Sequence, residues 1–391
     1  MEGDFIKIND WLLPLSWIYG AGVRLRNQMF EMGMLKSRSF DIPVISVGNI
    51  TVGGSGKTPH VEYLINLLRD KVKVAVLSRG YKRKSKGYML ATADTPMSDI
   101  GDEPYQMKKK FADIYVAVDK DRCHGIDQLT ANEETSDTDV ILLDDAYQHR
   151  YVKPGVNILL VDYHRLIMYD KLLPAGRLRE PQKGKARADI VIVSKCPAEL
   201  KPMEFRVITK AMNLFPYQKL YFTTLKYGSL RPIYGGEDRK LDTLTGDTSI
   251  LLLTGIASPQ QMIVDLKPYT GRITPLTFPD HHQYTDADID RINAEFEAMK
   301  GNDKMIVTTE KDNARLCGME GLSDEVKKNI YVLPVEVGFM LDQEEDFNEN
   351  IIGYVRKNSR NSILAKAKDD NKSDNSDNSG NRTRTISFRN N

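Results

Sequence analysis

A glycine-rich segment near the N-terminus constrains the fold more than any other part of the sequence. Residues 51–58 are TVGGSGKT, and they lie between a β-branched run at residues 42–47 and a helical pattern at residues 57–69. A strand, a glycine-rich turn and a helix in this order are typical of a P-loop, which binds nucleotide phosphates. Glycine lets backbone N–H groups turn toward phosphate oxygens without a Cβ clash, and the helix start adds its positive dipole end.

The residues of this segment have predicted roles in nucleotide binding. We expect Lys57 to reach the β- and γ-phosphates and the Thr58 hydroxyl to bind Mg²⁺. The usual pattern begins with glycine at the position of Thr51, so the segment departs from it at the first residue. A glycine-rich turn without a ligand is the alternative. The predicted nucleotide-binding residues are Thr51, Val52, Gly53, Gly54, Ser55, Gly56, Lys57 and Thr58.

An apolar run that ends in two aspartates supports this prediction. Residues 140–148 are VILLDDAYQ, so Asp144 and Asp145 come at the carboxyl end of a predicted strand. In P-loop enzymes an aspartate at this place holds Mg²⁺, directly or through water. The sequence leaves open which of the two contacts the ion. Together with the P-loop, the pair predicts a Mg²⁺-dependent nucleotide-binding enzyme or switch.

The apolar runs of the first 218 residues predict an α/β fold. They are rich in valine and isoleucine and lack clean alternation, which is typical of parallel strands buried on both faces. Helical patterns lie between several of them, as at residues 57–69 and 103–111. We therefore expect a doubly wound sheet with helices on both faces. The runs occupy residues 42–47, 72–77, 115–118, 140–143, 156–161 and 190–193.

The pattern changes near Leu220 and predicts a second, smaller α/β domain. Residues 220–234 alternate around Gly228 and predict a hairpin or a two-stranded linker between the two domains. The expected parts are an N-terminal membrane-associating helical segment (1–40), a P-loop domain (41–218), the smaller α/β domain (219–356) and a disordered polar tail (357–391). The further elements of the smaller domain are strands at 250–253, 273–278, 305–308 and 331–335 and a helix at 286–299.

The N-terminal segment has the composition of an interfacial anchor. Residues 11–23 carry no charge and contain both tryptophans of the chain, and two arginines follow at once. The stretch is too short to cross a bilayer, which takes about 20 apolar residues. Indoles at the headgroup level and arginines on lipid phosphates suit a membrane surface. We expect membrane contact through residues 11–26; a helix packed on the protein's own core is the alternative.

Composition argues against several other classes. The 55 basic and 54 acidic residues give a net charge of +1, so bulk charge offers no case for nucleic-acid binding. Cys123, Cys196 and Cys317 are far apart and show no CxxC or CxH spacing, which argues against a disulfide framework and a structural zinc site. Residues 357–391 are rich in Asn and Ser and hold too few apolar side chains to offset the entropy of ordering.

The motifs favour a kinase over a GTPase. A GTPase carries D-x-x-G after its second motif, whereas Tyr147 and Gln148 stand at the third places after the two aspartates. Residues 194–197 (SKCP) lack the Asn and Asp that read guanine. A kinase needs positive charge around the transferred phosphoryl group and a base for the acceptor hydroxyl. The loops expected at the carboxyl edge of the sheet offer both, at residues 78–86, 101–104, 119–122 and 173–181.

Taken in order, these motifs resemble the tetraacyldisaccharide 4′-kinase family of lipid A biosynthesis. The family shares the P-loop without the leading glycine, and the resemblance runs from about residue 11 to about residue 355. It implies a P-loop kinase with two α/β domains joined by a β-ribbon, peripheral on the cytoplasmic face of the bacterial inner membrane. The motifs are GNITVGGSGKTP, LSRGYKRKSKG, GDEP, LLDDAYQHR, LLPAGRLREP, FPDHHQY and TTEKD.

The resemblance also implies a reaction and a set of site residues. The family transfers the ATP γ-phosphate to the 4′-hydroxyl of a tetraacyldisaccharide 1-phosphate and so makes lipid IVA, with ATP and Mg²⁺ required. Asp102 would be the base and His281 its partner from the second domain, although His282 stays open as the alternative histidine. The other implied residues are Arg122 near the transferring phosphate, Asp144, Asp145 and Glu180 at the metal and substrate face, and Arg79 and Tyr81 near the lipid headgroup.

Two other functions remain open from the sequence. One is a P-loop switch or chaperone NTPase that acts on a protein partner. The other is a kinase of a soluble acceptor, with the N-terminal segment folded onto the core. For the lipid kinase we expect a monomer without a nucleic-acid partner.

Overall fold

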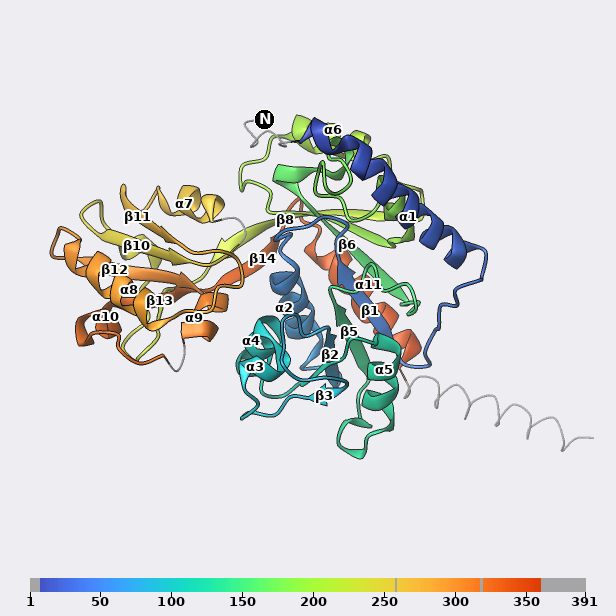
Figure 1. The fold of residues 1–391 in the computed structure, drawn as a ribbon, viewed down its shortest axis with the longest axis horizontal. Coiled ribbons are helices and arrows are strands. Elements are labelled where there is room, and N and C mark those ends of the chain that lie inside the picture. The colour runs from blue at the N-terminus through green and yellow to red at the C-terminus, as the bar shows by residue number, and fades with distance from the viewer. Residues whose placement is uncertain (1–7, 257–258, 317–318, 360–391) are drawn as a thin grey trace, which may run out of the picture.

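The strands form two sheets, each with helices packed against it (Figure 1). The computed structural model describes residues 8–256, 259–316 and 319–359. Within them, the larger sheet has the strand order β14-β8-β7-β6-β1-β5-β2-β4-β3 and the smaller one β11-β10-β12-β13-β9. All six apolar runs predicted in the first 218 residues are strands of the larger sheet. Its strands are β1 (Val44–Gly48), β2 (Val74–Ser78), β3 (Met89–Leu90), β4 (Tyr115–Val118), β5 (Val140–Asp144), β6 (Val156–Asp162), β7 (Ile190–Ser194), β8 (Lys219–Tyr227) and β14 (Val335–Phe339).

Helices cover both faces of the larger sheet, as a doubly wound fold requires. Alternate residues of each central strand point to opposite faces, so Leu142 packs in one core and Leu143 in the other. One face is covered by α2, α4 and α11, and the other by α5 and α6. These helices are α2 (Lys57–Leu68), α4 (Asp102–Lys110), α5 (Arg122–Ala131), α6 (Pro202–Met212) and α11 (Glu344–Asn358), with the short α3 (Met97–Ile100) before α4.

The smaller sheet is parallel except for its edge strand β9. Its two faces carry separate apolar cores, one built around Phe296 of α8 and the other around Leu266 of α7. The predicted helix is present, and so are the strands predicted at residues 250–253, 273–278 and 305–308. The elements are β9 (Arg231–Pro232), β10 (Ser249–Thr254), α7 (Gln260–Leu266), β11 (Arg272–Thr277), α8 (Asp286–Ala298), β12 (Lys304–Thr309), α9 (Glu310–Leu316), α10 (Asp324–Asn329) and β13 (Ile330–Leu333). Short 3-10 turns occupy Asp10–Leu12, Glu133–Thr135, Tyr163–Arg165, Ile167–Tyr169, Gln182–Arg187 and Leu241–Thr243.

The chain crosses between the two sheets through a ribbon of two strands, β8 and β14, which pair with each other in antiparallel fashion. The hairpin predicted inside residues 220–234 is therefore wrong, because the partner of β8 comes more than a hundred residues later and β9 pairs with β13. The single strand predicted at residues 331–335 is also wrong. Pro334 has no N–H to donate to a ladder, so the chain leaves one sheet there and enters the other.

The C-terminal elements return to the larger sheet. Phe347, Ile351 and Val355 of α11 lie in the same core as the strands of that sheet. The predicted second domain, residues 219–356, differs from this arrangement at its end, because β14 and α11 belong to the larger sheet. Residues 357 and 358 are helical, so the predicted tail begins too early, and the rest of that prediction, from residue 360, lies outside the described residues.

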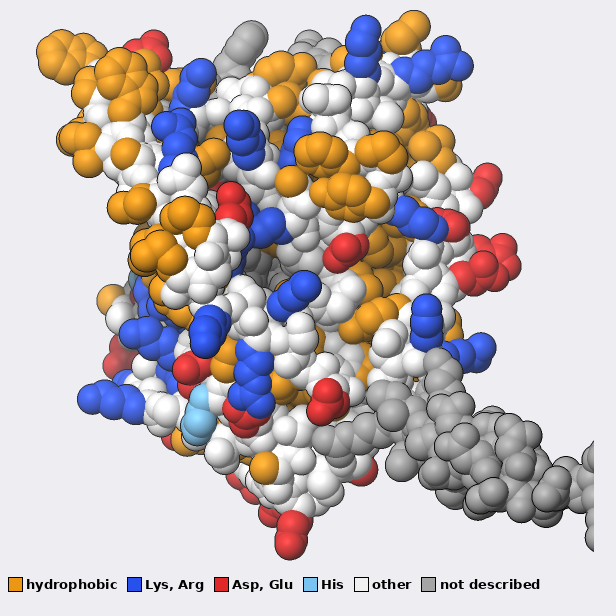
Figure 2. Space-filling view, turned by 90° about the vertical axis from the view of Figure 1, so that its right-hand side faces the viewer, with side chains coloured by type: hydrophobic (Ala, Val, Ile, Leu, Met, Phe, Trp, Pro, Cys, Tyr) orange, Lys and Arg blue, Asp and Glu red, His pale blue; other side chains and the backbone are white. Residues whose placement is uncertain are grey.

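The N-terminal helix α1 (Leu13–Glu31) lies at the upper right of the molecule in Figure 1. Several large apolar side chains of α1 and of the 3-10 turn before it are exposed. Trp11 is 93% exposed, Trp17 70% and Ile18 71%, whereas Ser16 is buried. The upper part of the face in Figure 2 shows hydrophobic side chains interspersed with Lys and Arg. None of the described helices is both long enough and apolar enough to cross a bilayer.

Candidate active site

The P-loop lies where predicted, between the end of β1 and the start of α2. Gly56 caps α2 with a φ of +78°, and Gly53 has a φ of +116°, so both positions favour glycine. At the position where the sequence departs from the usual pattern, the backbone is held by another loop. Thr51 is buried and forms an isolated β-bridge with Leu178, and the Val52 N–H donates to the Arg177 carbonyl at 2.8 Å. A second loop therefore supports the start of the P-loop.

Side chains from neighbouring strand ends hold the P-loop in shape. The Asn49 amide donates to the Ser55 hydroxyl at 2.7 Å, and the Ser194 hydroxyl donates to the Ser55 carbonyl at 2.9 Å. The Lys195 ammonium contacts the Gly54 carbonyl and lies 2.9 Å from a carboxylate oxygen of Asp162. The loop is thus preformed by contacts from β1, β6 and β7.

His60 ties the P-loop to the ribbon strand β8. Its Nδ1 donates to the Gly56 carbonyl at 2.7 Å, so Nε2 is left to accept from the Thr223 hydroxyl at 3.1 Å. Burial lowers the pKa of His60 to about 4, which keeps the imidazole neutral. A neutral ring is the form that this pair of hydrogen bonds needs.

The two aspartates after β5 differ in their environment. Burial, with the neighbouring charges of Asp145 and Glu103, raises the pKa of Asp144 to about 7. Burial also acts on Asp145, but Lys57 and Arg179 outweigh it and lower the pKa of that carboxyl. The Lys57 ammonium lies 3.6 Å from Asp145 Oδ1.

These residues suit a hard divalent cation. Asp144 Oδ1 is buried, and none of the described residues offers it a hydrogen bond, while Oδ2 accepts from the Ser78 hydroxyl at 3.2 Å. A buried carboxylate oxygen without a donor is the kind of group that a cation neutralises. Thr58 stands in the first turn of α2, next to Lys57. Thr58, Asp144 and Asp145 therefore have the donor chemistry that Mg²⁺ requires.

A second cluster joins the two parts of the molecule. Asp102, the first residue of α4, accepts from His281 Nδ1 at 3.0 Å and from Arg315 Nε and Nη2 at 2.9 and 2.5 Å. All three contacts are made by Oδ2. Burial would raise the pKa of Asp102, but the hydrogen bonds and charges of His281 and Arg315 outweigh it and hold the pKa at about 2.

The adjacent residues His281 and His282 lie in different surroundings: His281 belongs to this cluster, whereas His282 contacts residues near it in the sequence. His281 has a φ of +59°, which turns it toward Asp102, and its ring lies 5.1 Å from that of Tyr81. His282 stacks on Phe278 and lies 2.9 Å from Asp288 at the start of α8. Among the two, His281 is the partner of Asp102.

Ion pairs between α4 and α9 continue this contact. The first two residues of α4 each pair with a basic residue of α9, Asp102 with Arg315 at 2.5 Å and Glu103 with Lys311 at 2.9 Å. At the other end Lys110 lies 2.8 Å from Glu310. The larger and smaller sheets are therefore joined by charged contacts beside the cluster as well as by the ribbon.

The sequence of residues 8–356 matches the family described as tetraacyldisaccharide-1-P 4′-kinase. The chain belongs to this family. It is 60% identical over 93% of its length to a tetraacyldisaccharide 4′-kinase of Phocaeicola vulgatus, covering 99% of that protein. It is 54% identical to one of Bacteroides fragilis, over 95% of this chain and the whole of the relative.

A solved structure of the family has the same fold. The crystal structure of LpxK from Aquifex aeolicus in complex with ATP superposes with a TM-score of 0.67 at 32% identity, covering 88% of this chain and 98% of the other. The family resemblance, the P-loop α/β fold and the ATP-dependent kinase class predicted from the motifs are thereby confirmed.

The remaining predicted site residues of this 4′-kinase family member occupy different surroundings. Arg79 and Tyr81 are exposed. The turn between them packs closely against Gly101, which precedes Asp102: a Cβ on Gly101 would lie only 2.9 Å from the Tyr81 carbonyl oxygen. Arg122 is only 2% exposed, and its guanidinium donates to the Asp119 carbonyl at 3.2 Å.

Glu180 is held away from solvent by an ion pair. Its carboxylate lies 2.9 Å from Arg187 and accepts from the Asn27 amide of α1 at 3.4 Å. No described residue links it directly to Asp144 or Asp145. The preceding residue, Arg179, does contact one of the aspartates: its guanidinium lies 3.5 Å from a carboxylate oxygen of Asp145. The predicted role of Glu180 at the metal stays a prediction.

Several residues that contact the predicted site residues were not predicted from the sequence. Arg315 has no motif of its own, although it follows TTEKD by one helical turn. Lys195 lies in the segment considered only for guanine recognition, and Asn49 stands inside the quoted motif GNITVGG. Each of them supports another residue through hydrogen bonds rather than presenting a recognisable spacing.

Proposed function

We propose that this protein transfers the γ-phosphate of ATP to the 4′-hydroxyl of a tetraacyldisaccharide 1-phosphate and thereby makes lipid IVA. The observation that carries the proposal is the contact of Asp102 with His281 and Arg315 at the edge of the sheet that bears the P-loop. The start of α4 lies near the aspartates at the end of β5. The charge of Glu103, the second residue of α4, reaches Asp144 and contributes to its raised pKa. A base therefore stands close to the phosphate site.

The P-loop would bind and orient the triphosphate. Backbone N–H groups of residues 53–58 and the helix start of α2 attract its oxygens, and Lys57 leaves Asp145 to contact the β- and γ-phosphates. Thr58, Asp144 and Asp145 would hold Mg²⁺, which neutralises charge on the β- and γ-phosphate oxygens. We infer that Arg122 and Glu180 act at the same edge, beside the transferring group and the metal.

Asp102 is positioned to accept the proton of the acceptor hydroxyl. Oδ2 is fixed by His281 and Arg315, and none of the described residues donates to Oδ1, which leaves that oxygen for the substrate. A carboxylate with a low pKa is a weak base, so it accepts the proton late, as the bond to phosphorus forms. His281 Nδ1 donates to the carboxylate, orients it and shares the proton. Because the base and its partner come from different sheets, their contact completes the site.

The exposed side of α1 would bring the enzyme to its lipid substrate. An acylated disaccharide leaves a bilayer only at a cost of about 0.8 kcal/mol per CH₂ group, so the kinase must come to the membrane. Trp11, Trp17 and Ile18 are mostly exposed and followed by arginines, which suits an interfacial helix on anionic lipid. Arg79 and Tyr81 would then meet the headgroup. We infer a monomer, peripheral on the cytoplasmic face of the inner membrane.

A phosphoryl-transfer assay tests the reaction. The full chain in detergent micelles would receive γ-labelled ATP, Mg²⁺ and a tetraacyldisaccharide 1-phosphate. Label at the 4′ position of the lipid is the expected result. Slow release of free phosphate without labelled lipid would contradict the proposal and favour a switch-type NTPase.

Flotation with anionic liposomes tests membrane docking through α1. Trp11→Ser with Trp17→Ser should reduce the floated fraction several-fold, because both indoles are exposed. Val264→Ser is a matched control, since Val264 is 55% exposed on α7, in the other part of the molecule. Equal flotation of all three proteins would contradict docking through residues 11–26.

A further inference from the structure

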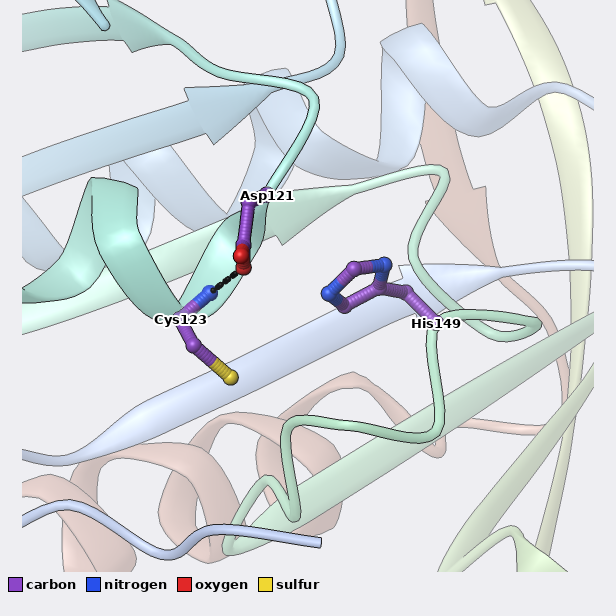
Figure 3. Close-up of side chains that lie close together, drawn as sticks. All are labelled: Asp121, Cys123 and His149. Carbon is purple, nitrogen blue, oxygen red and sulfur yellow. Dashed lines mark hydrogen bonds between the residues drawn. The ribbon is translucent and has the colours of Figure 1, made fainter. Parts of the chain in front are cut away.

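Asp121, Cys123 and His149 meet at a place that the kinase reaction does not account for. Asp121 and Cys123 flank Arg122 at the start of α5, and His149 lies in the loop after β5 (Figure 3). One ligand atom from each side chain lies within 4.8 Å of the other two. The sequence spacing argued against a zinc site, but here the fold joins ligands from two separate loops.

The carboxylate of Asp121 is already fixed in orientation. Oδ1 accepts from the N–H groups of Cys123 and His124 at 2.9 and 3.4 Å and so caps α5. None of the described residues donates to Oδ2, which is therefore available as a ligand. Figure 3 shows the Asp121 carboxylate beside Cys123.

The imidazole of His149 offers a buried nitrogen that lacks a hydrogen-bond partner. Nε2 is buried, and no described residue donates to it or accepts from it. Figure 3 shows that this ring nitrogen, remote from Cβ, faces Asp121 and Cys123. Burial, together with the charge of Arg122, lowers the pKa of His149 to about 4, so the ring is neutral at pH 7. A buried polar atom without a partner requires an explanation, and a neutral imidazole is the form that binds metals.

We propose that Asp121, Cys123 and His149 bind a thiophilic divalent cation of the zinc class, with a fourth position open to water. Thiolate and imidazole ligands select zinc over magnesium, and three protein ligands with an open position are typical of non-structural zinc sites. Ligand atoms around tetrahedral zinc lie about 3.5 Å apart, so small side-chain rotations close the observed spacing. The ion replaces the proton on Cys123 Sγ, which is released to solvent.

Such an ion would link two loops that carry proposed catalytic groups. Asp121 and Cys123 hold Arg122 between them, and His149 follows Asp145 in the loop after β5. Arg122 already reaches across this gap, since its Nη2 lies 3.5 Å from the Asp144 carbonyl oxygen. A bound cation would fix the two loops to each other at a place distinct from the Mg²⁺ residues.

Cobalt titration of the full chain tests the site without reference to kinase activity. Co²⁺ bound to a thiolate gives a charge-transfer absorption in the near ultraviolet. We expect one Co²⁺ per chain with this absorption, and its displacement by Zn²⁺. Cys123→Ser should abolish the band, whereas Cys317→Ser, the matched control, should keep it.

Two further variants separate ligand loss from misfolding. Asp121→Asn keeps the helix cap but removes the charge, and His149→Gln removes the imidazole. Each should weaken Co²⁺ binding at least about tenfold while melting temperature and circular dichroism stay near those of wild type; a metal ligand commonly contributes that much or more. Absence of the band in wild type, its persistence in Cys123→Ser, or unchanged affinity in both other variants would overturn the proposal.

Discussion

The two ends of the candidate active site are built in different ways. The phosphate end, residues 51–58 with Asp144 and Asp145, comes from two adjacent parallel strands of one sheet. The acceptor end, Asp102 with His281 and Arg315, joins residues up to 213 positions apart and drawn from both sheets. Adjacent strands and a turn fix the first by local structure, whereas the second exists only while α4 and α9 are in contact.

This difference separates binding from chemistry. ATP binding depends on a loop that is preformed by its own neighbours, so we expect it to survive changes at the acceptor end. In the proposed mechanism phosphoryl transfer requires both ends, so it should respond to any change that displaces Asp102. Variants at each end therefore give different combinations of ATP affinity and turnover.

The largest effect is expected at the phosphate end. Lys57→Ala should lower phosphoryl transfer on the order of 10³-fold, because it removes a charge that stabilises the transferring group. It should also weaken ATP binding, which equilibrium binding of a labelled nucleotide would measure. Lys71→Ala, an exposed lysine just after α2, serves as the control. Wild-type ATP affinity in Lys57→Ala would mean that this end is not the phosphate site.

Asp102→Ala should affect transfer alone. Loss of a general base costs on the order of 10²- to 10⁴-fold in turnover, while the ATP dissociation constant should remain that of wild type. Asp102→Asn keeps the shape and tests the charge by itself. Turnover of Asp102→Ala within about twofold of wild type would refute its assignment as the base.

Substitution of Arg315 tests the electrostatic part of the acceptor end. Arg315 helps to hold the pKa of Asp102 at about 2, so Arg315→Met should raise that pKa. In the proposed mechanism the carboxylate form is the active one, and the acid limb of kcat/KM should therefore move to higher pH. Turnover near neutral pH should fall roughly tenfold, because a misplaced base is inefficient.

Arg315→Lys provides the matched comparison, because it keeps the charge but not the two-nitrogen contact. Its acid limb should move less than that of Arg315→Met. Loss of turnover in Arg315→Met with an unchanged acid limb would indicate a structural role only. Thermal melting of both variants measures that structural share.

The sequence predicted the phosphate end in detail because its geometry is local. A contiguous motif between a strand and a helix fixes the backbone, and the glycines mark positions such as Gly53 and Gly56 that have positive φ. The strands were predictable for the same reason, since burial on both faces leaves an apolar run. The support that Thr51 receives from its bridge to Leu178 was not predictable, because Leu178 lies in a distant loop.

The contacts of the acceptor end could not be predicted from the spacing of residues in the sequence. Only the family resemblance paired Asp102 with His281. No sequence pattern indicated Arg315, a buried residue that also donates hydrogen bonds to the Asp312 carboxylate and the Gly255 carbonyl. The ribbon shows the same limit. Alternation predicted strand structure within residues 220–234, but it carries no information on the partner, and β14 takes the place that the expected hairpin strand would have had.

The smallest effect is expected where the two sheets meet at the surface. The Lys311 ammonium lies 2.9 Å from Glu103, close to the acceptor end but without a contact to Asp102 in the described structure. Partly exposed pairs of this kind contribute about 0–1 kcal/mol, so Lys311→Met should change turnover by no more than about threefold. A double-mutant cycle with Glu103→Gln measures the coupling between the two residues. The opposite result would be a tenfold or larger loss of turnover in Lys311→Met with ATP affinity unchanged. That outcome would mean that the partly exposed Glu103–Lys311 pair, rather than the buried Asp102–Arg315 pair, holds α4 against α9 and so assembles the acceptor end.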